Sequence, residues 1–255
     1  MSMIYVNFPG FLHQLFERYG EINQTLAIFF YVLGTLICVV IPYLLGSFNT
    51  AIIVSKYLYH DDIRKYGSGN AGLTNMHRVY GKKGALYTLL GDVLKQFLSV
   101  SIGMLVMGRN GAFLAGTFCI LGHIAPIYFR FKGGKGVLAA ATMVLMMDPI
   151  MFLVLFAVFA LVVLIFRYIS LGSMMAGFVY PALVFYRTKV LNDNSPPSFS
   201  YMLFACFIGL LIIFMHRENM KRIMNNQESK FSFKKKPLKE EETEKAEKQE
   251  KKKKK

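Results

Sequence analysis

The residues best suited to chemistry lie in three polar segments that interrupt a very apolar chain. The first is Gly67–Arg78, with the sequence GSGNAGLTNMHR. Its three glycines let the backbone turn several N–H groups toward one point, and its hydroxyl and amide side chains add neutral donors. Arg78 adds a permanently charged, two-pronged donor. This composition is typical of an anion site, although a loop of this kind is also common as a simple connection. The glycine spacing matches neither nucleotide-binding loop pattern, so no nucleotide is indicated.

The second segment, Gly122–Gly136, ends in the sequence KGGKG directly before an apolar run. A glycine-rich turn at the start of a helix offers N–H groups and the positive end of the helix dipole, which suits a phosphate. Lys132 and Lys135 add charge there, or else they only anchor the chain at the membrane surface. His123 lies in an apolar stretch, where a hydrogen-bonded packing role is expected more often than ligand binding.

The third segment, His216–Lys230, follows the last apolar run. If the helix continues through it, His216, Asn219 and the pair Lys221–Arg222 occupy neighbouring positions at the membrane boundary. A basic cluster next to a membrane span is usually a topological anchor, and for this segment taken alone that interpretation is favoured.

The composition indicates what kind of protein must position these segments. Of the 255 residues, 54% are hydrophobic and 18% are charged, and the chain from about Lys234 is almost entirely Lys and Glu. The remaining body is too apolar to be a soluble globular enzyme, and it is not collagen-like, disulfide-rich or disordered as a whole. The net charge of +15 is interleaved with apolar runs, which indicates membrane topology and anionic headgroups rather than nucleic acid.

Seven apolar runs are candidates to cross a membrane. They are 25–46, 85–107, 112–129, 137–147, 150–166, 171–186 and 201–215. The fourth is short, so five crossings is the competing number. Cys38, Cys119 and Cys206 each lie inside such a run and are expected to be small core side chains.

Lys and Arg in the short loops collect on one side of the predicted bundle, which the positive-inside rule assigns to the cytoplasm. We therefore expect an all-α, polytopic membrane helix bundle of about seven transmembrane helices, with the N-terminus outside and the C-terminus cytoplasmic. Residues 1–24 form an N-terminal extension, 25–230 the membrane domain, and 231–255 a Lys/Glu-rich cytoplasmic tail. The tail is expected to be disordered, because it has too few apolar residues to fold.

The three segments closely resemble the three motifs of the bacterial integral-membrane acyl-phosphate:glycerol-3-phosphate acyltransferases (PlsY type), in the family's order and at similar separations. The resemblance runs from about residue 25 to about residue 230 and also covers Ser170–Ser173. Departures are Ala71 and Leu73 in the first motif, Asn49 in place of a proline, and Asn226 in place of a glycine in the third motif.

This resemblance implies transfer of a fatty acyl group from acyl phosphate to the 1-hydroxyl of glycerol 3-phosphate, which gives lysophosphatidic acid and phosphate. It assigns catalytic roles to Ser68, Arg78, His216 and Asn219. It assigns substrate binding to Gly69, Asn70, Asn75, Lys132, Gly133, Gly134, Lys135, Gly136, Ser170 and Ser173, and a structural role to Glu228. Neither a cofactor nor a metal is expected, since no carboxylate cluster or His/Cys spacing fits one.

None of the five histidines is followed by an aspartate five residues later, so the His/Asp dyad of other glycerolipid acyltransferases is absent. Either His216 or the phosphate of the substrate then takes the hydroxyl proton. Because acyl phosphate is already activated, the site mainly has to hold two anions together. We therefore expect Ser68, Arg78, Lys135 and Asn219 to share one cytoplasmic pocket.

The leading alternative is a transporter or channel for a phosphorylated anion, because Asp92, Lys95 and Asp148 are ionisable residues within or beside apolar runs. The chain shows no self-similar halves, which favours the enzyme. The expected partners are glycerol 3-phosphate, acyl phosphate, the lipid bilayer and, by a functional link, an acyl-phosphate-producing enzyme. The expected location is the bacterial cytoplasmic membrane, with the active site on the cytoplasmic face.

Overall fold

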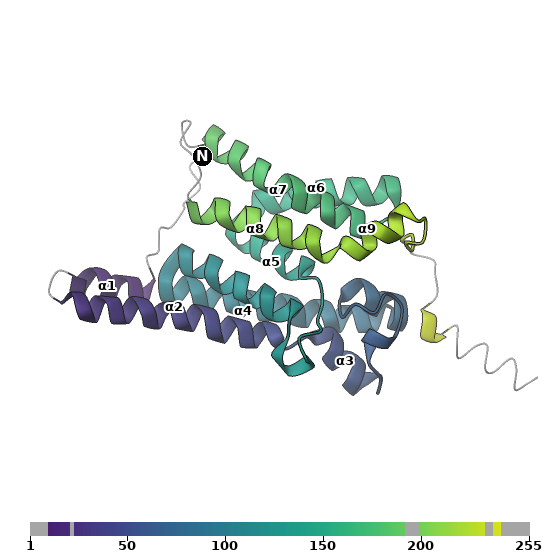
Figure 1. Cartoon of the computed structure of the whole chain (residues 1–255), viewed down its shortest axis with the longest axis horizontal. Helices are drawn as coiled ribbons and strands as arrows, with labels where there is room; N and C mark the ends of the chain where they lie inside the picture. The colour runs from purple at the N-terminus through teal and green to yellow at the C-terminus, as the bar shows by residue number, and fades with distance from the viewer. Residues whose placement is uncertain (1–9, 21–22, 192–198, 233–236, 241–255) are drawn as a thin grey trace, which may run out of the picture.

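The structure is a computed structural model of the chain that describes residues 10–20, 23–191, 199–232 and 237–240 (Figure 1). Within these ranges the regular elements are all helical. They are α1 (Phe11–Gly20), α2 (Gln24–Ser47), α3 (Thr50–Leu58), η1 (Ile63–Lys65), α4 (Leu73–Ile124), η2 (Ile127–Phe129), α5 (Val137–Met147), α6 (Pro149–Phe166), α7 (Ile169–Leu191), α8 (Phe199–Met215) and α9 (Arg217–Met224). The expected all-α class is confirmed for the described chain.

The longest element, α4, is a bent helix that reverses direction. Its backbone leaves the helical conformation at Gly81 and again at Met107 and Gly108. The two arms on either side of Gly108 run antiparallel, as the hydrogen bond from Gln96 Nε2 in the first arm to the Gly116 carbonyl in the second shows; its length is 3.2 Å. The second and third predicted apolar runs are therefore the two arms of one hairpin.

Four helical stretches are long and apolar enough to span a membrane, and a fifth is added if α8 is taken together with α9, which is bent from it by 50°. The hairpin α4 counts as one of these stretches. Within α6 only Met151 is buried, and ten of its side chains are exposed, most of them large and apolar. Such an apolar outer face is expected of a helix in contact with lipid tails.

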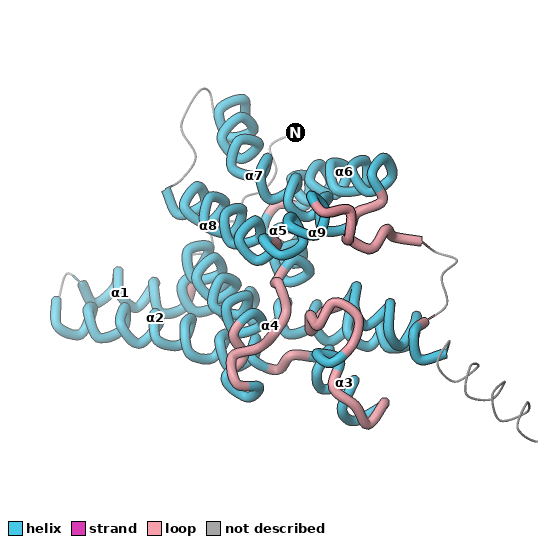
Figure 2. Tube along the Cα trace, turned by 45° about the vertical axis from the view of Figure 1, so that its right-hand side comes forward, coloured by secondary structure: helices cyan, strands magenta, loops and turns pink. Residues whose placement is uncertain are grey.

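The helices form two layers that meet at α5. One layer contains α2, α3 and α4, the other contains α6, α7 and α8, and both Figure 1 and Figure 2 show α5 between them. Buried apolar side chains from α4, α5, α7 and α8 fill the space between the layers, among them Phe113, Met143 and Phe204. A second, smaller core of Ile52, Ile63 and Met76 with neighbouring residues supports the first motif.

Both extensions outside the predicted membrane domain contact it where they are described. Helix α1 packs against α2 and α4, and Figures 1 and 2 show it running alongside the start of α2. In the tail, Leu238 packs against the smaller core. The expected disorder of the tail stays a prediction, since residues 233–236 and 241–255 lie outside the described chain.

Candidate active site

The first motif folds as a tight loop that leads into α4. Gly67 and Gly69 have left-handed backbone conformations, with φ of 59° and 70°, which glycine adopts without strain. The buried side chain of Asn75 accepts a hydrogen bond from the Ser68 N–H at 2.9 Å and donates one to the Tyr66 carbonyl at 3.0 Å. Asn75 thus shapes the loop from within, and its contact with substrate stays a prediction. The Ser68 side chain is exposed.

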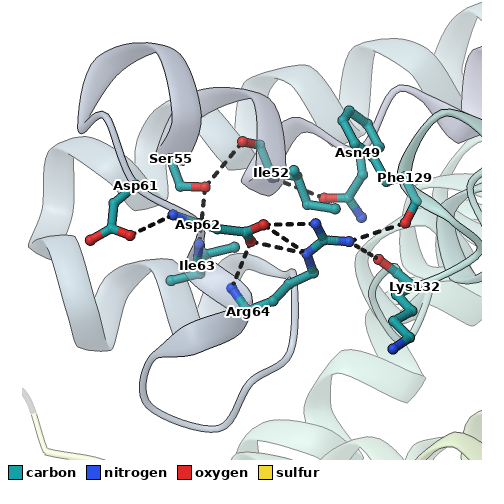
Figure 3. A network of polar contacts seen from close by, with 9 residues as sticks. All are labelled: Asn49, Ile52, Ser55, Asp61, Asp62, Ile63, Arg64, Phe129 and Lys132. Atoms are coloured by element: carbon teal, nitrogen blue, oxygen red, sulfur yellow. Dashed lines mark hydrogen bonds and ion pairs between the residues drawn. The ribbon is translucent and has the colours of Figure 1, made fainter.

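Asn49 joins the first motif to the second. Its Oδ1 accepts the Ile52 N–H at 3.1 Å and so caps α3, which is the helix-starting role that asparagine favours (Figure 3). Its Nδ2 lies 3.3 Å from the Ala71 carbonyl and 3.5 Å from the His123 carbonyl. The fully buried Asn49 therefore ties the corner between α2 and α3 to both loops.

Arg64 makes a second link between the two loops. Its Nε and Nη2 bond to the Asp62 carboxylate at 2.9 and 2.7 Å, and its Nη1 donates to the carbonyls of Phe129 and Lys132 at 3.1 and 3.3 Å. Figure 3 shows the guanidinium between these partners, with the Lys132 side chain pointing away from it. The ion pair with Asp62 orients Arg64, so the second loop is held by charge-assisted bonds.

The glycines of the second motif serve close packing rather than an open ring of donors. We expected the N–H groups of Gly133 and Gly134 to face an anion, but they donate to the carbonyls of Ile124 and His123, each at 3.1 Å. The last carbonyls of a helix have no N–H partner within the helix, and here the N–H groups of the loop are their partners. A Cβ at either glycine would collide with the end of α4. What remains for an anion is the first turn of α5, which no side chain caps at Gly136.

The third motif meets the second at a chain of polar contacts. Lys135 Nζ donates to Asn219 Oδ1, and Asn219 Nδ2 donates to Glu228 Oε1 at 2.6 Å. Ser170 Oγ also donates to that oxygen at 2.9 Å, and Arg222 Nε bonds to the other carboxylate oxygen at 2.8 Å. Residues from the loop before α5, the start of α7 and α9 thus converge on one carboxylate.

A left-handed turn after α9 returns Glu228 to this point. The N–H groups of Gln227 and Glu228 both donate to the Arg222 carbonyl, at 2.7 and 3.2 Å. Asn226 has a φ of 54°, a conformation that asparagine tolerates better than most residues. The asparagine that stands where a glycine was expected therefore keeps a glycine-like turn.

Positive charge exceeds negative charge in this cluster. Burial lowers the pKa of Arg78, while Glu228 raises it and Arg222 lowers it, so Arg78 of the first motif lies within electrostatic range of these two residues. Burial lowers the pKa of Lys135 to about 8; Glu228 opposes this shift, and Arg222 and Arg78 add to it. We call Arg78, Lys135 and Arg222, with Glu228, the cationic cluster. Arg222 bonds to Glu228, and Arg78 and Lys135 lie within electrostatic range of this one carboxylate, so three cations face a single negative charge, which favours binding of a further anion.

His216 stands beside this cluster as a neutral imidazole. Its Nδ1 lies 2.8 Å from the Ile212 carbonyl, which can only accept, so Nδ1 carries the proton and Nε2 has a free lone pair. Burial, together with the charge of Lys135, lowers the pKa of His216 to about 4. The imidazole is therefore available as a proton acceptor at neutral pH.

The structure brings six of the predicted site residues into or beside the cationic cluster: Arg78, Lys135, Ser170, His216, Asn219 and Glu228. Other predicted residues lie in the two loops around it: Ser68, Gly69, Asn70, Asn75, Lys132, Gly133, Gly134 and Gly136. Ser173 is buried and donates to the Ile169 carbonyl of its own helix at 3.0 Å. Its substrate contact stays a prediction.

Three residues of the site were missed from the sequence. Arg222 was interpreted as a membrane anchor, although its spacing from Glu228 lets one short turn join them. Arg64 follows Asp62 by two residues, a local ion pair that signals a fixed guanidinium. Asn49 stands directly before a helical segment, which is the signal of a helix cap.

The ionisable residues inside the apolar runs are paired with one another. Lys95 Nζ lies 2.8 Å from the Asp92 carboxylate and 2.9 Å from His123 Nδ1, and it donates to the carbonyls of Gly46 and Phe48 at 3.2 and 3.1 Å. This buried group links the two arms of α4 to the end of α2, and it confirms the expected hydrogen-bonded role of His123.

Asp148, the third such residue, is engaged at the other end of the bundle. It caps α6 through the Met151 N–H at 3.0 Å, forms an ion pair with Arg187 and accepts from the Tyr201 hydroxyl at 3.2 Å. All three acidic or basic groups that suggested a transport pathway thus have structural partners. This observation favours the enzyme over the transporter.

Fold and site together define a class: an integral-membrane helical protein that gathers cations at one end of its bundle. Residues 36–226 match the family described as glycerol-3-phosphate acyltransferase. The chain is 38% identical over 195 residues to the glycerol-3-phosphate acyltransferase of Thermoanaerobacter pseudethanolicus, covering 76% of this chain and 94% of that protein. For the Finegoldia magna protein of the same name the identity is 36% over 191 residues, with 75% and 93% covered.

The structure is also similar to crystal structures of PlsY (YgiH), an integral membrane glycerol 3-phosphate acyltransferase. For its glycerol 3-phosphate form the TM-score is 0.70 at 34% identity, covering 78% of this chain and 96% of that one. For its lysophosphatidic acid form the TM-score is 0.67 at 33% identity, with 78% and 95% covered. The chain belongs to the glycerol-3-phosphate acyltransferase family.

Proposed function

We propose that this protein transfers a fatty acyl group from acyl phosphate to the 1-hydroxyl of glycerol 3-phosphate, forming lysophosphatidic acid and phosphate. Family membership and the two similar PlsY structures, named for glycerol 3-phosphate and lysophosphatidic acid, support the acceptor and the product. The observation that carries the proposal is the cationic cluster, where parts of all three motifs converge with more positive than negative charge.

In this proposal Arg78 and Lys135 neutralise the phosphates of the two substrates. Each keeps a charge that Glu228 offsets only in part, so an arriving dianion gains charge-assisted hydrogen bonds. Asn219 and Ser170 both bond to the Glu228 carboxylate, which has a structural role and orients the neighbouring cations. Ser68 and the first turn of α5 supply neutral donors for the carbonyl oxygen as it becomes negative.

The transfer step needs a single proton acceptor. The 1-hydroxyl oxygen forms the new ester bond to the acyl carbon, the bond from that carbon to the phosphate oxygen breaks, and phosphate leaves with the electron pair. The hydroxyl proton passes to His216 Nε2 or to a phosphate oxygen. Burial and the charge of Lys135 favour the neutral state of His216, and the bond to Ile212 places its proton on Nδ1; both support His216 Nε2 as the acceptor.

We further propose seven crossings: α2, the two arms of α4, and α5 to α8. The N-terminus then lies outside, and the three motifs and the C-terminus lie in the cytoplasm. The Lys and Arg of the motif-bearing loops support this orientation. The protein would act in the bacterial cytoplasmic membrane, with residues 25–230 as its acyltransferase domain, and it would use the acyl phosphate that another enzyme produces.

The decisive experiment measures phosphate release by the purified protein in detergent. We expect release from acyl phosphate only when glycerol 3-phosphate is present, together with formation of lysophosphatidic acid. Arg78→Met is the matched inactive control, since it removes the charge but keeps the length of the side chain. A protein that is inert in detergent but moves a phosphorylated anion across sealed vesicles would instead be the transporter.

A further inference from the structure

A short segment beyond the family's match lies on the first motif. Pro237–Glu240 begins seven residues after Lys230, the end of the third motif, and is outside residues 36–226. Figure 1 shows it, in yellow, beside the start of α4. We call these four residues the C-terminal strap.

Two residues of the strap make apolar contacts. Pro237 covers Gly81, where α4 leaves the helical conformation with a φ of 75°, and a Cβ at this glycine would lie 2.9 Å from the proline ring. Leu238 packs against the smaller core that contains Ile63 and Met76. The strap therefore covers both the break in α4 and the core beneath the first motif.

Lys239 adds a polar contact directed at the same loop. Its Nζ lies 3.2 Å from the Asp61 carboxylate and 4.0 Å from the centre of the Tyr66 ring, so it makes an ion pair and a cation–π contact together. The Tyr66 carbonyl accepts the side chain of Asn75, which in turn holds the Ser68 N–H. Lys239 is thus connected to Ser68 through two residues, Tyr66 and Asn75.

The other end of the same stretch is attached to the opposite layer. Phe231, three residues after Glu228, donates its N–H to the carbonyl of Arg167 at 2.7 Å. Arg167 directly follows the end of α6. The described residues on either side of 233–236 therefore contact different layers: Phe231 contacts the layer that carries Asn219 and Glu228, and Leu238 and Lys239 contact the layer that carries Ser68 and Arg78.

We propose that the C-terminal strap positions the first-motif loop for acyl transfer, with Lys239 as its positioning residue; this inference rests on the proposed function. The strap fixes the first-motif loop and the start of α4 in the position at which Arg78 lies within electrostatic range of Glu228 and Arg222. Losing it leaves the membrane bundle folded but lets the first motif move away from the third.

The test compares steady-state kinetics of four single or double variants in detergent. For Lys239→Glu and for Asp61→Lys we expect the KM for glycerol 3-phosphate to rise roughly three- to tenfold, with a smaller change in kcat. The double variant restores the ion pair and should return to within about twofold of wild type, and Lys239→Arg should be close to wild type. Lys251→Glu, another lysine reversal in the tail, is the matched control.

A wild-type KM in Lys239→Glu, or a double variant as impaired as the worse single variant, would overturn the inference. A chain that ends after Ser232 gives a second measurement that needs no activity: hydrogen exchange of residues 60–80 should become faster than in the full chain. Unchanged hydrogen exchange of residues 60–80 would also overturn the inference that the C-terminal strap positions the first-motif loop. An inactive wild-type protein whose truncation still speeds this exchange would contradict the proposed function and leave the strap intact.

Discussion

At the scale of single residues, Lys135 is the member of the cationic cluster whose charge changes with pH just above neutrality. Burial lowers its pKa to about 8, so it is charged below that pH and neutral above it. We expect kcat/KM for glycerol 3-phosphate to fall as the pH rises through about 8. Lys135→Arg should move this fall to higher pH, because a guanidinium stays charged. Lys135→Met should lower kcat/KM at pH 7 by roughly 10- to 100-fold, the worth of a charge-assisted bond.

The control for Lys135 is Lys132→Met, since Lys132 is exposed in the same loop and points away from the neighbouring Arg64 network. It should change kcat/KM far less. If Lys135→Arg kept the wild-type fall near pH 8, another group would be titrating.

His216 is the residue that decides where the hydroxyl proton goes. His216→Ala removes the free Nε2, and we expect kcat to fall roughly 10²- to 10⁴-fold, as for other general bases. In the wild type the acid limb of kcat/KM should lie near pH 4, where His216 becomes charged. A pH–rate profile of the variant checks both points. Near-full activity with an unchanged profile would show that the phosphate takes the proton.

At the scale of elements, the second motif depends on close packing at its glycines. A Cβ at Gly134 would collide with His123 Nε2 and approach the Ala71 carbonyl, so Gly134→Ala should push the second loop away from the first. Overpacking of this kind costs about 1–3 kcal/mol. We expect activity to fall at least roughly tenfold by displacement of Lys135, with the chain still folded. Activity and melting temperature of the purified variant are the measurements.

The matched control is Gly177→Ala in α7, where an added Cβ would have no neighbour closer than 3.3 Å. It should keep nearly full activity. Equal losses in both variants would argue that general destabilisation, rather than movement of the loop, explains the effect.

At the scale of the whole molecule, the seven-crossing topology can be tested by chemical labelling. In a background without the three native cysteines, single cysteines replace Lys83 before the first arm of α4 and Lys189 near the end of α7, both exposed positions. A membrane-impermeant maleimide applied to intact cells should label position 189 at once and position 83 only after lysis. Labelling of position 83 in intact cells would reverse the orientation.

The sequence alone was enough to predict the helices and the family. Apolar runs of membrane-spanning length must be helical in lipid, since every backbone N–H and C=O there needs a partner within its own segment. This requirement is local, so α2, α6 and α8 were found close to their observed bounds. The three motifs were found because their residue types and spacing are unusual in so apolar a chain.

Only the tertiary structure decided which polar groups meet. The amides of Gly133 and Gly134 looked like an anion site, yet they bond to the end of α4, because the loop of residues 125–132 folds back on the helix that precedes it. Arg222 looked like an anchor, yet it pairs with Glu228. A hydrogen bond depends on which groups lie within about 3 Å of each other. That distance is set by how the loops fold and how the helices pack, as for Lys135 and Asn219, which are 84 residues apart in the chain.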